Sequence, residues 1–377
     1  MKVLPHLLYY IFMKFPIKKN KILFIGYYGS QYGCSPKYLS EHIVKTRPDW
    51  DVVWAFTRPE IYNIRGVRKV KYWSLHYFYE LYTSRVVVTN YRMTEDYRKR
   101  KGQYYVMTWH SSLRLKKIEG DAEDSLPEHY VKMAKEDSKK IDLLLSGCKF
   151  SDEIFRRAFW YDGKILSSGT PRSDIFYVPD SKERANMIKK QLHLSSDTKI
   201  LLYAPTFRKG DKLDCYDLNY DRLRCVLEHV KGGTWKILVR LHPHLLHFSR
   251  DLFKGYDIVD VTKYDDIQEL LLISDILITD YSSLMFDFAE TRRTCFLYVP
   301  DLIDYQKQDR SLYFDIKDLP FTISLTQDEL ECQLGSFDEQ KYVNDINKFL
   351  RDVGSYEDGH ASQRVTKYIE KWIQRKE

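Results

Sequence analysis

Histidine, arginine, serine and threonine side chains recur soon after short apolar runs of this sequence. His110 follows the run YYVMT, and His242 follows the run WKILV. A guanidinium pairs bidentately with phosphate, and an imidazole can donate to phosphate or carry a proton near neutral pH. These residue types therefore indicate phosphate binding or proton transfer. The other candidates on such loops are Ser111, Gly169 and Arg172 in the first half of the chain, and Thr206, Arg208, Arg240, Pro243, Asp280, Ser282, Ser283 and Asp287 in the second.

The segment ILITDYSSLMFDFAE is typical of a strand, a tight turn and a helix. The backbone N–H groups of Ser282 and Ser283 would then open a helix N-terminus, where phosphate oxygens bind. An ordinary helix cap by either serine is the alternative. Agreement with the loops that carry Arg208 and His242 favours phosphate binding. For His110 alone, a structural hydrogen-bonding role is more common than a role as general base.

Two further patterns are similar to cofactor or metal motifs without matching them. GYYGSQYG at Gly26–Gly33 follows the first predicted strand, but it lacks the GxGxxG spacing, so we interpret it as a loop for close backbone approach. DWD at Asp49–Asp51 precedes a strand, whereas a metal-binding DxD would follow one. The histidines of RLHPHLLH have no carboxylate or helix context for zinc. The sequence therefore predicts no cofactor and no essential metal.

Short apolar runs between amphipathic stretches must position these loops, and they predict the strands of βα repeats. Because the runs are apolar throughout rather than alternating, they are typical of parallel strands covered by helices on both faces. They fall into two sets that break near Phe176–Ser181. We therefore expect two doubly wound, Rossmann-like α/β domains facing a cleft, over residues 21–177 and 178–345, with ligands beyond the carboxyl ends of the strands. A closing helix is expected within 346–377, and its buried face would be Val365, Tyr368, Ile369, Trp372 and Ile373.

The composition and the distribution of charge restrict the class of protein. Of 377 residues, 44% are hydrophobic and 30% are charged, which excludes a disordered tail, a collagenous repeat and a multi-span membrane protein. The net charge is +12 over residues 1–176 and −5 over 177–377. The basic half suits a membrane surface, a phosphorylated substrate or nucleic acid, and charge alone does not choose among them. Six cysteines without a CxxC pair predict reduced thiols in the cytosol.

The first 20 residues carry an amphipathic pattern. The apolar residues recur at helical spacing, and the nearby charges are all lysines, so the segment is typical of a helix that lies on an anionic membrane. A first helix packed on its own domain is the alternative. The apolar run is too short to span a bilayer, and it is followed by no small-residue cleavage site, so we expect neither a transmembrane nor an exported protein. The apolar residues of the pattern are Leu4, Leu7, Leu8, Ile11 and Phe15.

The motifs also occur in an order that resembles a known family, the CDP-glycerol:poly(glycerophosphate) glycerophosphotransferases of teichoic acid and capsule synthesis. The resemblance covers nearly the whole chain, and its specificity comes from eight motifs in sequence rather than from any one of them. The motifs are GYYGSQYGCSPKYLSEHI, TWHSSLRLKKIEGD, SGTPRSDIF, YAPTFR, RLHPH, ITDYSSLMFDFAE, VPDLIDYQKQDRSLYFD and DGHASQRV.

This resemblance implies a GT-B fold and a peripheral enzyme on the cytoplasmic face of the membrane. The C-terminal domain would bind CDP-glycerol or CDP-ribitol, and the N-terminal domain would receive a prenyl-diphosphate-linked acceptor, whose hydroxyl attacks the β-phosphorus while CMP leaves. The two functional histidines of the family match His110, as the base, and His242. Arg310 joins the donor-binding candidates. The implied acceptor-side residues are Gly29, Tyr32, Ser111, Gly169 and Arg172.

The sequence departs from the family pattern mainly in the first half. Ser111 replaces the usual glycine, Cys34 and Ser35 replace an Asp-Asn pair, and Ser311 replaces another glycine. The first two departures affect the acceptor side, so they bear on acceptor identity. Two other functions stay open: a GT-B glycosyltransferase that uses a nucleotide sugar, and a membrane-surface assembly protein without turnover. The basic residues form no nucleic-acid-binding module, so we expect no nucleic acid partner. The sequence leaves glycerol or ribitol, priming or polymerisation, and the oligomeric state undecided.

Overall fold

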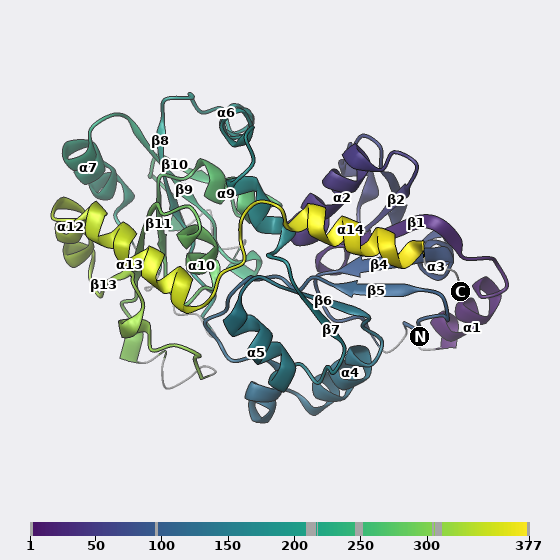
Figure 1. Ribbon diagram of the computed structural model, residues 1–377. Coiled ribbons are helices and arrows are strands. Elements are labelled where there is room, and N and C mark those ends of the chain that lie inside the picture. The colour runs from purple at the N-terminus through teal and green to yellow at the C-terminus, as the bar shows by residue number, and fades with distance from the viewer. Residues whose placement is uncertain are drawn as a thin grey trace. The chain divides into compact units, whose positions relative to one another are not determined.

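The computed structural model describes residues 3–94, 97–208, 216, 218–245, 252–303, 305 and 311–374. The chain forms two compact units. The first comprises residues 1–112, 118–177 and 355–377, and the second comprises 113–117 and 178–354. Each unit is built on one parallel sheet with helices around it (Figure 1). The predicted pair of doubly wound α/β domains is therefore confirmed.

The first unit contains a seven-stranded sheet in the order β3-β2-β1-β4-β5-β6-β7, and all of its pairings are parallel. The central strands are buried almost throughout, as their continuous apolar runs predict. The strands are β1 Lys18–Ile25, β2 Asp51–Phe56, β3 Arg68–Lys71, β4 Ser84–Thr89, β5 Tyr104–Met107, β6 Leu143–Ser146 and β7 Lys164–Ser167. The helices are α1 Val3–Phe12, α2 Cys34–Thr46, α3 Leu75–Thr83, α4 Glu128–Ser138, α5 Lys149–Ala158 and α14 Ala361–Ile373.

Alternate side chains of β1 enter two different cores, because successive residues of a strand point to opposite faces of the sheet. Leu23 and Ile25 pack in a cluster with α1, α3 and α5. Ile22 and Phe24 pack in a second cluster with α2 and α14. The predicted buried face of α14 is confirmed: Val365 and Ile369 are fully buried, and Tyr368, Trp372 and Ile373 pack against this second core.

The second unit contains a six-stranded sheet in the order β10-β9-β8-β11-β12-β13, again parallel throughout. One large apolar cluster on this sheet joins side chains of β8, β9, β11 and β12 to α7 and α12. The strands are β8 Lys199–Tyr203, β9 Trp235–Val239, β10 Ile258–Asp260, β11 Ile276–Thr279, β12 Thr294–Tyr298 and β13 Thr322–Ser324. The helices are α6 Ser181–Gln191, α7 Tyr220–Lys231, α9 Ile267–Ile273, α10 Leu284–Ala289, α12 Gln327–Gly335 and α13 Glu339–Asp352.

The predicted domain boundaries need three corrections. Residues 113–117 belong to the second unit, because Lys117 N–H donates to the Ser311 carbonyl at 2.9 Å and Tyr313 N–H donates to the Leu115 carbonyl at 2.8 Å. The predicted segment 346–377 is divided, since α13 packs in the second unit and α14 in the first. The predicted segment 1–20 already contains the start of β1. The passage from the first unit to the second at residues 177 and 178 is where the sequence places it.

Helix α1 packs against α3 with one side and exposes apolar residues on another. The Leu8 side chain is buried, and the rings of Tyr9 and Tyr82 lie 5.2 Å apart between centroids. Arg100 donates to the carbonyls of Met13 and Phe15, just beyond the end of the helix. The predicted alternative, a first helix packed on its own domain, therefore holds for part of its surface. The exposed apolar residues are Tyr10, Ile11, Met13 and Phe15.

No helix in the described part of the chain combines the length and the apolar character that crossing a membrane requires.

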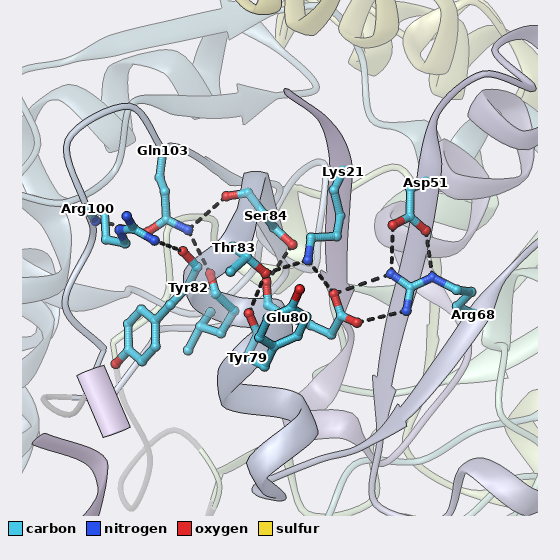
Figure 2. A network of polar contacts seen from close by, with 11 residues as sticks. Lys21, Asp51, Arg68, Tyr79, Glu80, Tyr82, Thr83, Ser84, Arg100 and Gln103 are labelled. Atoms are coloured by element: carbon cyan, nitrogen blue, oxygen red, sulfur yellow. Dashed lines mark hydrogen bonds and ion pairs between the residues drawn. The ribbon is translucent and has the colours of Figure 1, made fainter. Parts of the chain in front are cut away.

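A buried ionic network joins the start of β1 to β2, β3 and α3 (Figure 2). The ammonium of Lys21 is fully buried, and it donates to the Glu80 carboxylate at 2.6 Å and to the Thr83 hydroxyl. Arg68 bridges Glu80, at 2.8 Å, and Asp51, at 2.7 Å. Burial lowers the pKa of Lys21, against the opposing effect of Glu80. Asp51, from the DWD pattern, is thus a structural partner of Arg68.

Replacing Glu80 by glutamine is expected to destabilise the first unit by about 2 kcal/mol, because Lys21 keeps an acceptor but loses the buried charge that compensates it. Urea unfolding measures the effect. Lys21→Met in the Glu80→Gln background should recover part of the loss, since it removes the uncompensated ammonium. Equal stability of Glu80→Gln and the parent chain would contradict this interpretation. Glu339→Gln, at an exposed ion pair, is the matched control and should cost less than about 0.5 kcal/mol.

Candidate active site

Each sheet reverses its strand order at one point, and ligands of doubly wound folds bind beyond the carboxyl ends of the strands at that point. In the first unit the reversal lies between β1 and β4. In the second unit it lies between β8 and β11. The loops that leave these strands, and those of the neighbouring β5 and β9, carry most of the polar candidates that the sequence singles out.

His110 lies just beyond β5, and its side chain is exposed. Its ring Nδ1 is 3.1 Å from the backbone carbonyl oxygen of Asn90, the residue that follows β4. Its ring also lies against Trp109, with 4.3 Å between centroids, and Trp109 has a left-handed backbone with φ of 52°. Non-glycine residues in this conformation are strained and concentrate at functional sites. Arg172 donates from its guanidinium to the His110 carbonyl.

The contact with Asn90 fixes the protonation of the His110 ring. A carbonyl oxygen only accepts hydrogen bonds, so Nδ1 must carry the hydrogen. In the neutral ring the other nitrogen, Nε2, then carries the lone pair to which a proton binds. This tautomer suits a general base at Nε2, and the catalytic role of His110 stays a prediction.

The other acceptor-side candidates have mainly structural surroundings. Gly29 is buried with φ of 79°, and a Cβ atom there would lie 3.1 Å from the Tyr72 side chain. The Tyr32 ring packs edge-on against Trp54, at 5.0 Å between centroids. Ser111 is partly exposed beside His110. The geometry thus places Ser111 next to the base and gives Gly29 and Tyr32 roles in packing; their acceptor contacts stay predictions.

The loop at Gly169 holds an anion from its own unit. The Thr170 N–H and hydroxyl both donate to the Glu357 carboxylate, at 3.0 and 2.8 Å. Gly169 has φ of 75°, and a Cβ atom there would lie 2.9 Å from Glu357 Oε2. The Gly169 loop therefore binds the carboxylate of Glu357, which directly precedes the DGHASQRV motif, and its predicted acceptor-side role stays a prediction. Arg172 is buried and donates to the His110 carbonyl, and its acceptor contact stays a prediction.

In the second unit, Asp280 connects the two loops at the reversal point. Asp280 follows β11 directly and is buried, and its carboxylate accepts from Thr206 N–H at 2.9 Å. The Arg208 guanidinium lies 2.9 Å from the same carboxylate. Burial raises the pKa of Asp280, while Arg208 and the Thr206 N–H oppose that rise. The carboxylate therefore ties the β8 loop to the β11 loop.

The guanidinium of Arg208 also has a second carboxylate partner. Its Nε lies 2.6 Å from Asp301 Oδ2, and its charge lies 4.9 Å from the ring centres of both Tyr281 and Tyr305. Those two rings stack on each other, with 3.5 Å between centroids. The Arg208 guanidinium thus pairs with two carboxylates of its own unit, whereas the sequence predicts that it binds the phosphates of the CDP-polyol. Its donor contact stays a prediction, and a phosphate would have to compete with Asp301.

The two serines before α10 also differ from the expectation. Helix α10 has only six residues and begins at Leu284, so its macrodipole is small. The Ser282 hydroxyl accepts from Leu284 N–H at 3.3 Å, and the Ser283 hydroxyl accepts from Leu115 N–H at 3.2 Å. Each hydroxyl keeps its own hydrogen to donate, and both side chains are partly exposed. Ser282 acts within its turn, and Ser283 anchors the inserted segment 113–117.

His242 is exposed beyond β9 and faces the neighbouring histidine. Its Nδ1 lies 3.3 Å from the backbone N–H of His244, so Nδ1 accepts and the neutral ring carries its hydrogen on Nε2. The two rings stack with 4.9 Å between centroids. Burial and His244 lower the pKa of His242. At pH 7 the His242 ring is therefore neutral and can donate a hydrogen bond from Nε2–H. Its tautomer is the opposite of the His110 tautomer.

The remaining donor candidates are less informative. Arg240 follows β9 and is partly exposed, Pro243 begins a short 3₁₀ turn, and Asp287 is buried in α10. Arg310 lies outside the described residues. Within the described ranges, no group of three histidine, cysteine or acidic side chains is placed to hold a metal ion.

Several residues at these sites have no distinguishing signal in the sequence. Asn90, Asp301 and Glu357 are single polar residues, and each becomes important only through a partner distant in the chain. The one usable signal is position, because Asn90 and Asp301 follow predicted strands just as the recognised candidates do.

Two doubly wound parallel sheets, one in each unit, place the chain among proteins with a GT-B-like fold. A sequence model of the CDP-glycerol:poly(glycerophosphate) glycerophosphotransferase family matches residues 7–371, and the chain belongs to that family. The chain resembles a solved structure of the wall teichoic acid polymerase TagF with a TM-score of 0.84 at 32% identity, over 95% of this chain and 90% of that one.

Relatives of different activity occur in the family. The chain is 34% identical to the teichoic acid poly(glycerol phosphate) polymerase of Staphylococcus epidermidis over 95% of its own length and 51% of that protein. It is 32% identical to the teichoic acid glycerol-phosphate transferase of Staphylococcus aureus over 98% of both. It is 27% identical to the teichoic acid ribitol-phosphate primase of Bacillus spizizenii, over 95% of this chain and 92% of that protein. The chain thus spans about half the length of the first polymerases that it matches.

Proposed function

We propose that this protein transfers glycerol phosphate or ribitol phosphate from the CDP-activated polyol to a hydroxyl of a prenyl-diphosphate-linked acceptor, in teichoic acid or capsule synthesis. The observation that carries the proposal is the exposed His110 ring, whose Nδ1 donates to the Asn90 carbonyl, so that Nε2 is the basic nitrogen of the neutral ring. Membership of the glycerophosphotransferase family supports the donor class, and a TagF structure soaked with CDPG supports it further.

The transfer is one displacement at phosphorus. His110 Nε2 removes the proton from the acceptor hydroxyl, and the oxygen attacks the β-phosphorus of the donor. The bond from the β-phosphorus to the bridging oxygen breaks, and CMP leaves with that electron pair. His242 Nε2–H is suited to donate to the pyrophosphate, because its Nδ1 is already occupied by the His244 N–H.

A panel of donors tests this proposal. The purified chain is incubated with CDP-glycerol, CDP-ribitol and UDP-sugars, each with and without a prenyl-diphosphate-linked acceptor, and free nucleotide is measured. We expect acceptor-dependent release of CMP from one or both CDP-polyols and no release of UDP. Release of UDP alone would favour the glycosyltransferase alternative, and no release from any donor would favour the assembly protein.

The pH dependence of donor binding tests the role of His242. Because its pKa is lowered, the ring is neutral between pH 8 and pH 7 and gains a proton only in more acidic solution. CDP-glycerol affinity should be flat from pH 8 to pH 7 and rise by about fivefold toward pH 5.5, as a neutral hydrogen bond becomes charge-assisted. Calorimetry measures the affinity. His242→Gln should bind with no such rise, and His229→Gln, an exposed histidine on α7, should behave as the parent; a rise in His242→Gln would contradict the assignment.

We also propose that the protein lies peripherally on the cytoplasmic face of the membrane through α1. The support is the exposed apolar surface at Tyr10, Ile11, Met13 and Phe15 and the absence of acidic residues from positions 1–40. Such a surface binds anionic lipid through apolar insertion and charge together. Tyr10 and Ile11 lie on α1, and Met13 and Phe15 lie just after its end.

Liposome sedimentation tests the membrane contact without disturbing the packed side of α1. The double variant Ile11→Ser with Met13→Ser keeps Leu8 and Tyr9 in place, and we expect it to lose most binding to anionic liposomes while its donor affinity is unchanged. Met187→Ser removes an apolar residue on α6 that is more exposed than Ile11 or Met13, and it is the control. Unchanged sedimentation of the double variant would refute the contact through α1.

A further inference from the structure

The surroundings of His110 contain two buried polar side chains that do not face solvent. Asn90 is fully buried and Arg172 is 4% exposed, whereas the His110 ring is exposed. All three belong to the first unit. Both buried side chains are joined to His110 by hydrogen bonds of their residues, so they are placed to act on the reaction through His110.

Asn90 has two separate contacts. Its backbone carbonyl accepts from His110 Nδ1 at 3.1 Å, and its side-chain Oδ1 accepts from the backbone N–H of Tyr27 at 2.9 Å. Tyr27 and Tyr28 have left-handed backbones, with φ of 44° and 57°. Such a turn is costly for non-glycine residues and persists only when neighbours hold it. The Asn90 side chain therefore fixes the end of β4, from which its own carbonyl reaches the histidine, against the loop that follows β1.

Arg172 contacts the backbone of His110, whereas Asn90 contacts its ring. Its guanidinium donates to the His110 backbone carbonyl, and a second contact of 3.5 Å joins it to Cys34 Sγ at the start of α2. The His110 ring is thus fixed at Nδ1 by one neighbour and its backbone is fixed by another. The Trp109 ring lies against the imidazole as a third contact, with 4.3 Å between centroids.

We propose that Asn90 and Arg172 are positioning residues for the transfer reaction, which together hold His110 as the Nδ1–H tautomer with Nε2 directed to the acceptor hydroxyl. The role in the reaction rests on the proposed function. The tautomer does not, because it follows from the contact with the Asn90 carbonyl. A base held in this way requires no reorientation before it accepts the proton.

Nitrogen NMR of the histidine-labelled full chain tests the tautomer directly. The His110 signals are assigned by their loss in His110→Ala, and the pH is raised until these signals no longer change, so that the neutral ring is observed. We expect the hydrogen on Nδ1 in the parent chain and a mixture of the two tautomers in Asn90→Ala. A parent ring protonated on Nε2, or an Asn90→Ala ring unchanged from the parent, overturns the proposal whether or not the protein turns over any donor.

Steady-state kinetics test the effect on the reaction. Asn90→Ala and Arg172→Met should each lower kcat by about 10- to 100-fold, because a misplaced base loses most of its contribution, while KM and calorimetric affinity for CDP-glycerol stay within about twofold. Asn90→Asp retains the acceptor for Tyr27, and Arg172→Lys retains a donor for the His110 carbonyl, so each should recover part of kcat.

Asn344→Ala, at an exposed position of α13, and Arg184→Met, at an exposed ion pair of α6, are the matched controls and should keep parental kcat. Urea unfolding like that of the parent chain shows that the first unit of a variant has folded, because donor affinity reports on the second unit alone. Parental kcat in both Asn90→Ala and Arg172→Met would refute the positioning role. Absence of turnover in the parent chain itself would refute the proposed function and leave the NMR result as the test of this inference.

Discussion

Replacing His110 by alanine is expected to lower CMP release by about 10²- to 10⁴-fold, the usual contribution of a positioned general base. Without the ring, the acceptor hydroxyl must lose its proton to water while it attacks phosphorus. The donor should still bind with parental affinity, because the donor candidates lie in the second unit and His110 lies in the first. The measurements are acceptor-dependent CMP release and calorimetric titration with CDP-glycerol.

The control for this experiment is His229→Ala, which removes an exposed histidine near the end of α7 and should leave both quantities unchanged. A pH profile adds a second criterion, because the acid-side loss of activity in the parent should disappear from the residual activity of His110→Ala if the ring is the base. Full CMP release by His110→Ala would remove this residue from the mechanism. Loss of donor binding in the variant would instead show that its effect is not confined to the chemical step.

Asp280→Ala is expected to destabilise the second unit by about 3 to 5 kcal/mol, because it leaves Arg208 buried with one carboxylate instead of two and removes the acceptor of Thr206 N–H. The measurement is calorimetric unfolding, with the transition of the second unit followed separately where the two units unfold apart. Donor affinity should fall as well, since the β8 and β11 loops lose the carboxylate that joins them.

The double variant Asp280→Ala with Arg208→Met should recover part of the stability, because it removes the buried charge that the single variant leaves with one partner. Asp301→Ala should cost less than Asp280→Ala, since Asp301 is 24% exposed and water can replace part of its contact. Equal stability of Asp280→Ala and the parent chain would show that the carboxylate is not what holds the two loops together.

The contacts of Arg208 and Thr170 show why loop chemistry was only partly predictable. Both follow predicted strands and both carry groups that bind phosphate. In the structure, Arg208 pairs with Asp280 and Asp301, and the Thr170 hydroxyl donates to Glu357. A loop rich in hydrogen-bond donors attracts any carboxylate of the same unit as readily as a ligand. Residue type therefore predicts that an anion is bound, and the tertiary structure decides which anion it is.

The positions of the two histidines were predictable from the sequence, whereas their tautomers were not. The sequence predicts that His110 and His242 lie beyond strands of two different sheets, and the structure places them there. Their tautomers are opposite, because His110 Nδ1 faces a carbonyl and His242 Nδ1 faces a backbone N–H. The partner of His110 comes from another strand 20 residues away, so no local pattern contains it.

The amino-acid sequence by itself determined the inner strands of both sheets and the loops that carry His110, Arg208 and His242, because continuous apolar runs and their spacing are local properties of the chain. It did not predict the edge strands β3, β7, β10 and β13. Only the tertiary structure decided that residues 113–117 belong to the second unit, that Glu357 fills the Thr170 loop and that Asn90 and Arg172 hold His110. The physical reason is that each of these depends on a hydrogen bond between segments far apart in sequence. Such a bond is fixed by the packing of the whole unit and not by the residues on either side of it.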